Sequence, residues 1–399
     1  MLTSLALIFL VGLLTGSIFS RMNLPKIIGM LITGIVLGPF ALDLLDPSVL
    51  SISSELRKMA LIIILLKAGL SLDLADLKKV GRPAILMAFV PATFEILAYT
   101  MFAPKIFGIT RVEAALMGSV LGAVSPAVVV PRMVEYMEQK VGTKKAIPQM
   151  IMAGASCDDI FVIVLFTTFL GMAEGGAVNI KSLLNVPISI ILGAVLGAAL
   201  GYALYDYFER AYEKKRYIRN SVKVIILLGV SFLLVAVEGW LEGKVAVSGL
   251  IAVVSMASVL KMKSTVFVSK RLSEKFGKLW IAAEVVLFVL VGAAVDIRYT
   301  LEAGLAAVFM ILIALCIRAV GVAVCVAGTK LNAKERAFCV ISYLPKATVQ
   351  AAIGSVPLTA GLPSGKIILS VAVMAIILTA PLGAIGMDYT HKKFLERDV

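Results

Sequence analysis

Long apolar segments, separated by short charged connections, constrain the fold of this chain more than any other feature of its sequence. Hydrophobic residues make up 60% of the chain and charged residues 16%, whereas charged residues make up about 25% of a soluble globular domain. A helix needs about 20 apolar residues to cross the hydrocarbon core of a bilayer. Windows of this kind predict thirteen spans, at residues 2–20, 27–45, 59–74, 83–107, 113–131, 150–172, 186–207, 224–240, 245–260, 279–295, 305–327, 337–357 and 367–387. The sequence therefore predicts an all-α polytopic membrane protein with about 13 transmembrane helices.

The basic residues are distributed unevenly between the two sides of these spans. Of the 38 Lys and Arg residues, 27 follow odd-numbered spans, 8 follow even-numbered spans and 3 lie inside spans. Basic connections are retained in the cytoplasm, so we expect an outside amino terminus and a cytoplasmic carboxyl terminus in a cell membrane. This placement accounts for the formal net charge of +13 and argues against nucleic acid as a partner. The four cysteines show no metal-ligand spacing, and no cofactor is expected.

Two of the predicted spans are interrupted at their centres. The fifth is broken at Ser125 and Pro126, within GAVSPAVVVP, and the twelfth at Pro345 and Lys346, within SYLPKATVQAAIGSVP. A proline lacks the N–H that a helix needs and disrupts its hydrogen-bond ladder. The two spans lie seven crossings apart, so the two halves of the chain enter the membrane with opposite orientations. Broken spans at matching positions of inverted repeats indicate the binding site of a secondary transporter.

Two adjacent carboxylates, Asp158 and Asp159, lie inside the sixth span. They stand about 12–13 Å beyond its first residues, which places them near the bilayer midplane. We interpret them as the ligands of a transported Na⁺ or Li⁺, which prefers oxygen ligands and competes with a proton for the same carboxylate. Ser125 and the carbonyls freed beside it, such as those of Gly122 and Ala123, are further candidate ligands.

Four more charged side chains lie inside predicted spans. We expect Glu95 and Arg318 to form a structural pair, because an arginine in the membrane cannot readily lose its proton. Lys346 would offset the negative ends of the broken helices, and it could also pair with Asp158. We expect Lys67, near the end of its span, to reach the interface. The alternative for the two aspartates is that they only neutralise the buried cations and hold the bundle together.

Three motifs together resemble those of a known family. GAVSPAVVVP, AGASCDD and LPKATVQAAIGSVPL look like the corresponding segments of the monovalent cation:proton antiporters, and most closely of the NHA-type sodium/proton exchangers. The resemblance implies a homodimer in which a mobile core domain moves like an elevator against a dimerisation domain. The implied dimerisation domain comprises residues 1–82 and 221–300, the core domain residues 83–172 and 301–399 with a short cytoplasmic tail, and the linker helix residues 173–220.

The resemblance also assigns roles to individual residues. Asp159 matches the principal cation and proton carboxylate, and Asp158 matches its neighbour. Glu95 and Arg318 match an acid and an arginine that pair in this branch, and Lys346 matches the lysine of the second broken span. The implied function is the exchange of Na⁺ or Li⁺ for H⁺ by alternating access of the core domain.

One position departs from the family pattern, and other functions stay open. Animal members of this branch carry an acidic residue where this chain has Ala294, and the next acid, Asp296, is a candidate gate or ion-attracting charge. The alternatives are a K⁺/H⁺ antiporter of the same fold, a sodium-coupled symporter for an organic anion, and a non-transporting sensor or structural membrane protein. No span shows a nucleophile beside a base, so an enzyme is not expected.

Overall fold

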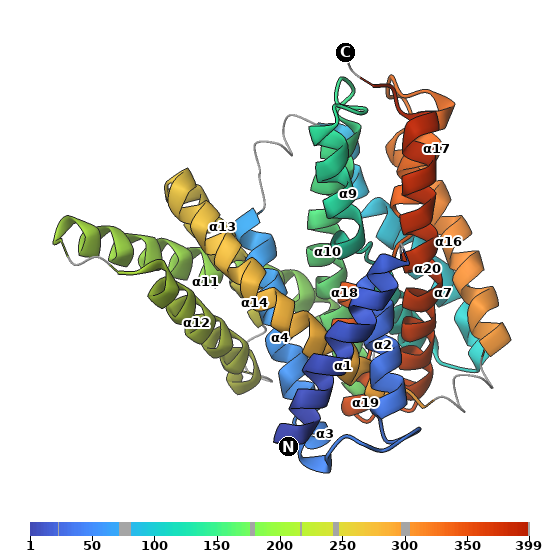
Figure 1. Ribbon diagram of the computed structural model, residues 1–399, viewed down its shortest axis with the longest axis horizontal. Coiled ribbons are helices and arrows are strands. Elements are labelled where there is room, and N and C mark those ends of the chain that lie inside the picture. Colours follow the sequence, from blue (N-terminus) through green and yellow to red (C-terminus); the bar gives the residue numbers. More distant parts are fainter. Residues whose placement is uncertain are drawn as a thin grey trace. The chain divides into compact units, whose positions relative to one another are not determined.

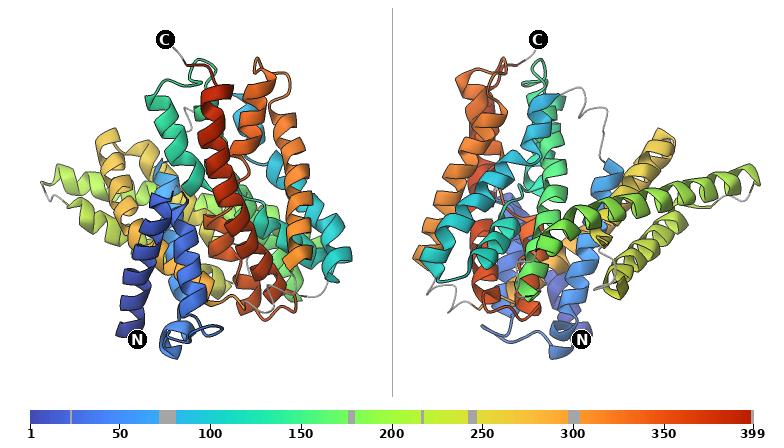
Figure 2. Two further views of the ribbon diagram at one scale, coloured as in Figure 1. Left: turned by 45° about the vertical axis from the view of Figure 1, so that its right-hand side comes forward. Right: turned by 180° about the vertical axis from the view of Figure 1, so that it is seen from behind.

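The computed structural model describes residues 1–22, 24–71, 81–175, 180–215, 218–241, 247–296 and 304–397. This part of the chain is helical apart from short connections (Figures 1 and 2). The one β-type pairing among these residues is an antiparallel bridge between Val141 and Arg397. Its internal contacts divide the chain into two compact units. Unit 1 comprises Met1–Ser54, Asp73–Gly175 and Val285–Val399, and unit 2 comprises Glu55–Leu72 and Gly176–Glu284.

Unit 1 contains most of the helices. They are α1 (Leu2–Arg21), α2 (Lys26–Leu37), α3 (Pro47–Ser51), α6 (Arg82–Met87), α7 (Val90–Phe107), α8 (Arg111–Leu121), α9 (Pro126–Glu138), α10 (Ile147–Gly175), α16 (Gly304–Cys325), α17 (Ala333–Ser342), α18 (Thr348–Ile353), α19 (Val356–Thr359) and α20 (Gly365–Phe394). Unit 2 contains α11 (Ile180–Glu213), α12 (Asn220–Leu241) and α13 (Gly249–Lys263). Unit 2 also takes most of α4 (Ser53–Ser71), whereas α14 (Val266–Ala293) contributes to both units.

Each predicted span overlaps at least one helix; the span at 27–45 is helical only to Leu37, and the span at 337–357 overlaps α17, α18 and α19. In the described residues, eight helices are long and apolar enough to cross a membrane: Leu2–Arg21, Arg82–Phe107, Ile147–Gly175, Ile191–Glu213, Asn220–Leu241, Val266–Ala293, Gly304–Cys325 and Gly365–Phe394. The other predicted spans fall on shorter, broken or more charged helices, so the count of thirteen stays a prediction. The span ends predicted at residues 72–74 and 245–246 lie outside the described residues.

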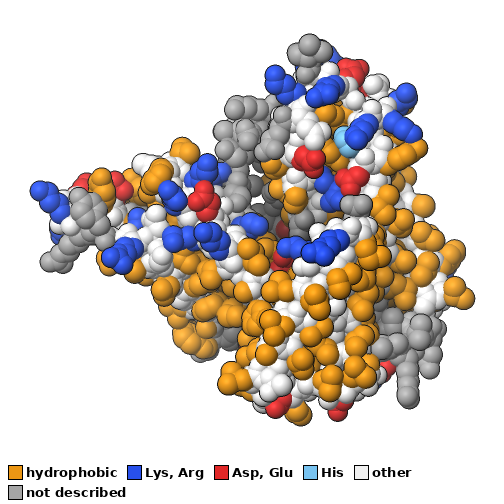
Figure 3. Space-filling view, viewed as in Figure 1, with side chains coloured by type: hydrophobic (Ala, Val, Ile, Leu, Met, Phe, Trp, Pro, Cys, Tyr) orange, Lys and Arg blue, Asp and Glu red, His pale blue; other side chains and the backbone are white. Residues whose placement is uncertain are grey.

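The outer surface of the long helices is apolar, as a bilayer requires. On the face shown in Figure 3, hydrophobic side chains cover the flanks of the helices, and Lys and Arg side chains gather around the end of α20 that leads to the carboxyl terminus. Leu305 and Phe309 of α16, for example, are 89% and 60% exposed. Such exposure is unfavourable in water but favourable in lipid. The chain is therefore a multi-pass membrane protein, as the sequence predicts.

Close helix packing in unit 1 brings the charged residues together. α7 packs against both α8 and α16, and α10 packs against α8 and α9. Gly118 of α8 lies directly on α7, because a Cβ atom there would stand 2.9 Å from Ile96 Cα. Gly383 of α20 lies in the same way against the ring of Pro345, with a Cβ only 2.7 Å from Pro345 Cδ. Small residues at these two points let the broken helices approach their neighbours.

Capping boxes begin the first half of each broken span. Thr110 Oγ1 accepts from Glu113 N at 3.2 Å at the start of α8, and Asn332 Oδ1 accepts from Glu335 N at 2.9 Å at the start of α17. The Glu335 carboxylate is 1% exposed and also accepts from Lys145 Nζ at 2.7 Å. The cap and this ion pair hold the start of α17 in place. The other end of α17 leads into the second break.

We expect Asn332→Ala to lower the free energy of unfolding by about 1 kcal/mol, because the N-cap of α17 is lost. Thermal unfolding of the purified protein in detergent measures this change. Lys334→Ala is the matched control, since Lys334 is exposed in the same turn of α17 and should change stability by less than about 0.5 kcal/mol. Equal stability of the two variants would contradict a structural role for this cap.

Candidate functional site

The two helix breaks predicted from the sequence are present, and they touch each other. α8 ends at Leu121 and α9 begins at Pro126, with residues 122–125 outside the helix; α17 ends at Ser342 and α18 begins at Thr348. The backbone N–H of Ser125 donates to the carbonyl of Pro345 at 2.8 Å. The breaks in the two inverted halves of the chain thus meet through their main chains.

The carbonyls at the first break accept hydrogen bonds from side chains of other helices. Gly122 O accepts from Arg318 Nη1, and Ala123 O accepts from Lys346 Nζ at 3.2 Å and from Gln350 Nε2 at 2.8 Å. Here the structure differs from the expectation that these freed carbonyls ligate the cation. The negative end of α8 faces two positive side chains and an amide, so the protein itself supplies the donors.

Four buried charged side chains form one ion-pair cluster near this break. Glu95 Oε2 accepts from Arg318 Nη1 at 2.6 Å and from Lys346 Nζ at 2.5 Å, and Arg318 Nη2 lies 3.3 Å from Asp158 Oδ2. All four side chains are at most 1% exposed. Glu95 and Arg318 are therefore paired, as the sequence suggested. Lys346, however, pairs with Glu95 rather than with Asp158, whose Oδ2 already accepts from Val124 N at 2.7 Å.

Asp159 lies beside this cluster but outside its network of bonds. Its side chain is 7% exposed, and no described residue forms an ion pair with it. Successive residues of an α-helix point about 100° apart, so Asp158 and Asp159 leave α10 in different directions, and Arg318 pairs with Asp158. Asp159 Oδ1, Asp158 Oδ1 and Ser125 Oγ are buried without a hydrogen-bond partner among the described residues. Unsatisfied buried oxygens of this kind need an explanation.

These oxygens have the chemistry that a small monovalent cation needs. Na⁺ and Li⁺ are hard cations, and carboxylates, hydroxyls and water are hard oxygen ligands. Within the described residues, no three His, Cys, Asp or Glu side chains come together in a way that could hold a metal ion. Asp159, Asp158 and Ser125 are therefore candidate oxygen ligands for one monovalent cation.

Sequence reasoning missed Tyr343, which lies at the second break. Its carbonyl accepts from Arg318 Nε at 2.8 Å, and the Arg318 guanidinium lies 5.6 Å from its ring centroid. Its hydroxyl lies against Gly154, where an added Cβ would collide with it. Gly154 precedes Asp158 by one helical turn on the same face of α10. The glycine in AGASCDD was the one signal in the sequence that something approaches α10 there.

Two polar residues that hold the second break were also missed. Thr379 Oγ1 of α20 accepts from Lys346 N at 2.9 Å, and Gln350 Oε1 accepts from Ala347 N at 2.8 Å. Thr379 is 1% exposed and Gln350 is fully buried. A lone glutamine within the apolar run after Lys346 is visible in the sequence, but its partners Ala123 and Leu121 come from the distant first break.

Asp296 is not on any of the helices that carry the buried charged cluster. It follows the end of α14 at Ala293 and is half buried. Its role as a gate stays a prediction.

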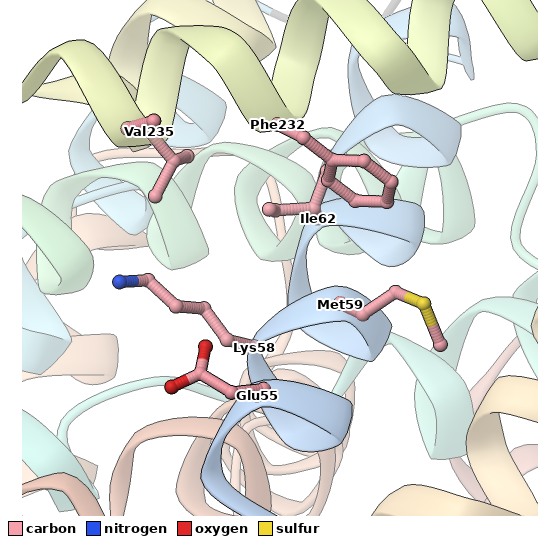
Figure 4. A pocket seen from close by; sticks show the side chains of 7 residues that line it. Glu55, Lys58, Met59, Ile62, Phe232 and Val235 are labelled. Carbon is pink, nitrogen blue, oxygen red and sulfur yellow. The ribbon is translucent and has the colours of Figure 1, made fainter. Parts of the chain in front are cut away.

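Unit 2 has a cavity of its own, with a volume of about 360 Å³ (Figure 4). Its walls come from α4 and α12, and the residues are Glu55, Lys58, Met59, Ile62, Phe232, Val235 and Ala236. Figure 4 shows Glu55 and Lys58 on one helix and the apolar side chains of Phe232 and Val235 on the other. None of the buried charged residues of unit 1 lines this cavity.

Two broken helices that meet beside a lone buried carboxylate define a secondary membrane transporter. The family model described as "Sodium/hydrogen exchanger, transmembrane" matches residues 5–388, and the chain belongs to this family. The resemblance drawn from the three sequence motifs is thereby confirmed.

Two human relatives agree with this assignment, and a solved structure has a similar fold. The chain is 33% identical over 390 residues to human sodium/hydrogen exchanger 9B1, covering 94% of this chain and 73% of that protein. It is 31% identical over 399 residues to human sodium/hydrogen exchanger 9B2, covering 94% and 70%. Its fold is similar to that of the sodium proton antiporter MjNhaP1 from Methanocaldococcus jannaschii, with a TM-score of 0.85, 20% identity and 98% of each chain covered.

Proposed function

We propose that this protein exchanges Na⁺ or Li⁺ for H⁺ across a cell membrane, with Asp159 as the carboxylate that holds the cation and the proton in turn. The observation that carries the proposal is the charge balance of the buried cluster. Glu95 and Asp158 bring two negative charges, and Arg318 and Lys346 bring two positive charges. Asp159 is left over, so one proton or one monovalent cation neutralises the site.

Competition between the two ions follows from this arrangement. A buried carboxylate without a partner is unfavourable in a low-dielectric interior. Protonation removes its charge, and a bound cation compensates it, but the same oxygen cannot do both at once. Asp158 Oδ1 and Ser125 Oγ, which also lack partners, would complete the cation's ligand set. Binding of one ion therefore expels the other, which is the basis of antiport.

The proposal includes movement of a core domain in a homodimer. The members of the ion-pair cluster come from α7, α10, α16 and the break before α18, all within the core domain implied by the sequence. Bonds among these elements favour their moving as one body. Residues 1–82 and 221–300 would form the dimer contact and the static part. The amino terminus would face outward and the carboxyl terminus the cytoplasm.

Proton efflux from proteoliposomes under an imposed pH gradient tests the function. Na⁺, Li⁺, K⁺ and choline are added in turn to vesicles with and without the purified protein. We expect Na⁺ and Li⁺ to collapse the gradient and choline to have no effect. A response to K⁺ alone would replace the proposal with a K⁺/H⁺ antiporter. Protein that is folded yet responds to no cation would refute antiport.

The apparent KM for Na⁺ should rise as pH falls, because protons occupy the carboxylate that Na⁺ needs. Where the site is mostly protonated, we expect KM to increase about tenfold for each pH unit, with the maximal rate at saturating Na⁺ nearly unchanged. Initial rates measured across Na⁺ concentrations at several symmetric pH values give this dependence. A KM that does not vary with pH would argue against a shared site.

A further inference from the structure

We infer that Gln350 is a positioning residue for cation binding, which holds the two helix breaks together and withholds the Ala123 carbonyl from the transported ion. The inference rests on the proposed function, because it concerns how the same site selects its cation. Gln350 lies in the first turn of α18 and is fully buried. It is neither one of the charged residues nor one of the oxygens that lack a partner.

The amide of Gln350 bonds to both breaks at once. Its Oε1 accepts from the N–H of Ala347 at 2.8 Å, within the second break. Its Nε2 donates to the carbonyl of Ala123 at 2.8 Å and, over a longer distance of 3.4 Å, to the carbonyl of Leu121, both at the first break. One side chain therefore satisfies a free donor of one half-helix and free acceptors of the other.

A side chain that accepts a hydrogen bond at one break and donates one at the other must be a neutral amide. Glutamine has an acceptor oxygen and a donor nitrogen on the same group. A glutamate could accept from Ala347, but its second oxygen would face the Ala123 carbonyl, and a lysine could donate but not accept. A neutral amide also keeps the same bonds whichever ion occupies Asp159, because it carries no charge that responds to the exchange.

The Ala123 carbonyl is saturated by the donors around it. A carbonyl oxygen has two lone pairs, and here Lys346 Nζ takes one at 3.2 Å and Gln350 Nε2 the other at 2.8 Å. Ser125, whose hydroxyl lacks a partner, lies two residues further along the same non-helical segment. Without Gln350 the carbonyl would regain a free lone pair, and the segment that carries Ser125 Oγ would lose one of its attachments.

We expect the loss of Gln350 to change cation affinity and selectivity rather than the maximal rate. A looser segment holds Ser125 Oγ less well in place as a ligand, which weakens cation binding. Li⁺ is smaller than Na⁺ and needs its ligands closer, so its binding depends more strongly on how precisely they are held. The proton site on Asp159 is not attached to Gln350 by any bond described here, and its chemistry should persist.

The test compares Gln350→Met with the wild-type protein in proteoliposomes. Methionine has a similar length but offers no amide. The change removes the bonds of Gln350 to Ala347, Leu121 and Ala123. Because these bonds act on the cation only through the position of Ser125, we expect the apparent KM for Na⁺ to rise about five- to tenfold, and the KM for Li⁺ to rise more. The maximal rate per folded protein should stay within about twofold of wild type. Gln139→Met is the matched control, because Gln139 is exposed and its side chain donates to Glu135 of the neighbouring helical turn, at 2.9 Å.

A second variant keeps the test decisive if Gln350→Met does not fold. Gln350→Asn retains a buried amide but is one methylene shorter, so it cannot reach both breaks, and we expect a smaller KM rise in the same direction. A merely structural role would lower the amount of folded protein and leave both KM values unchanged. Unchanged KM values and an unchanged Li⁺ to Na⁺ ratio in folded, active variants would overturn the inference alone. A wild-type protein that responds to no cation would overturn the proposed function, and this inference with it.

Discussion

Asp159→Asn is expected to abolish cation-driven proton movement and to leave the protein folded. Asparagine has nearly the same shape as aspartate, but its amide neither takes up a proton near neutral pH nor compensates a cation's charge. Asp159 has no ion-pair partner among the described residues, so its loss leaves no buried cation unpaired. The gradient assay measures the flux, and size-exclusion chromatography with thermal unfolding measures the fold.

Asp158→Asn is the informative control for this prediction. Asp158 Oδ2 accepts from Val124 N at 2.7 Å and lies 3.3 Å from Arg318 Nη2. Removing its charge takes a partner from a fully buried arginine, so we expect lower stability in this variant and not in Asp159→Asn. Full exchange activity of Asp159→Asn would refute the assignment of the transport carboxylate.

Arg318→Met is expected to destabilise the folded protein by about 3–5 kcal/mol. Arg318 is fully buried and donates to Glu95, Asp158 and the carbonyls of Gly122 and Tyr343. Its loss leaves Asp158 as an uncompensated charge and two carbonyls without these donors. Because that cost is comparable with the whole stability of many domains, the measured result should be a large fall in folded yield and unfolding temperature.

Arg132→Met provides a matched comparison at the surface. Arg132 makes two bonds to Asp388, at 2.7 and 2.9 Å, but the two side chains are 22% and 48% exposed. An exposed pair of this kind contributes no more than about 1 kcal/mol. If Arg318→Met were as mild as Arg132→Met, the ion-pair cluster would not be a main source of stability in unit 1.

A double variant tests charge balance directly. Combining Glu95→Gln with Arg318→Met leaves Lys346 and Asp158 as one positive and one negative charge. We therefore expect the double variant to recover part of the stability that Arg318→Met loses. No recovery would mean that hydrogen bonding by Arg318, and not its charge, dominates its contribution.

Much of the fold followed from the sequence because its signals are strong. Apolar length alone predicted the positions of the helices, and Pro126 and Pro345 predicted both breaks, since a proline inside a span has no N–H to donate. Glu95 and Arg318 were paired correctly because a buried arginine has few tolerable partners. The number of spans and the division into moving and static domains are still predictions, as they concern lipid and a second subunit.

The partners of Lys346 and of the freed carbonyls could not be predicted. Lys346 had a choice of carboxylates, and the sequence allowed Asp158, whereas the structure pairs it with Glu95 at 2.5 Å. That choice depends on distances of a few ångströms between α7, α10 and the second break. Gln350 was overlooked for the same reason, because its partners lie 3, 227 and 229 residues away in the chain.

The sequence by itself thus determined a helical membrane protein with two interrupted spans and a set of buried charges, because the cost of exposing backbone or charge to lipid leaves few alternatives. Only the tertiary structure decided which charge is left without a partner. Helix packing places Glu95 between Arg318 and Lys346 and leaves Asp159 outside these ion pairs. The attraction between two charges depends on their distance, and helix packing sets the distances in this cluster. The sequence motif makes Asp159 a candidate transport carboxylate, and the arrangement of the cluster supports that proposal, because it leaves Asp159 without an ion-pair partner among the described residues.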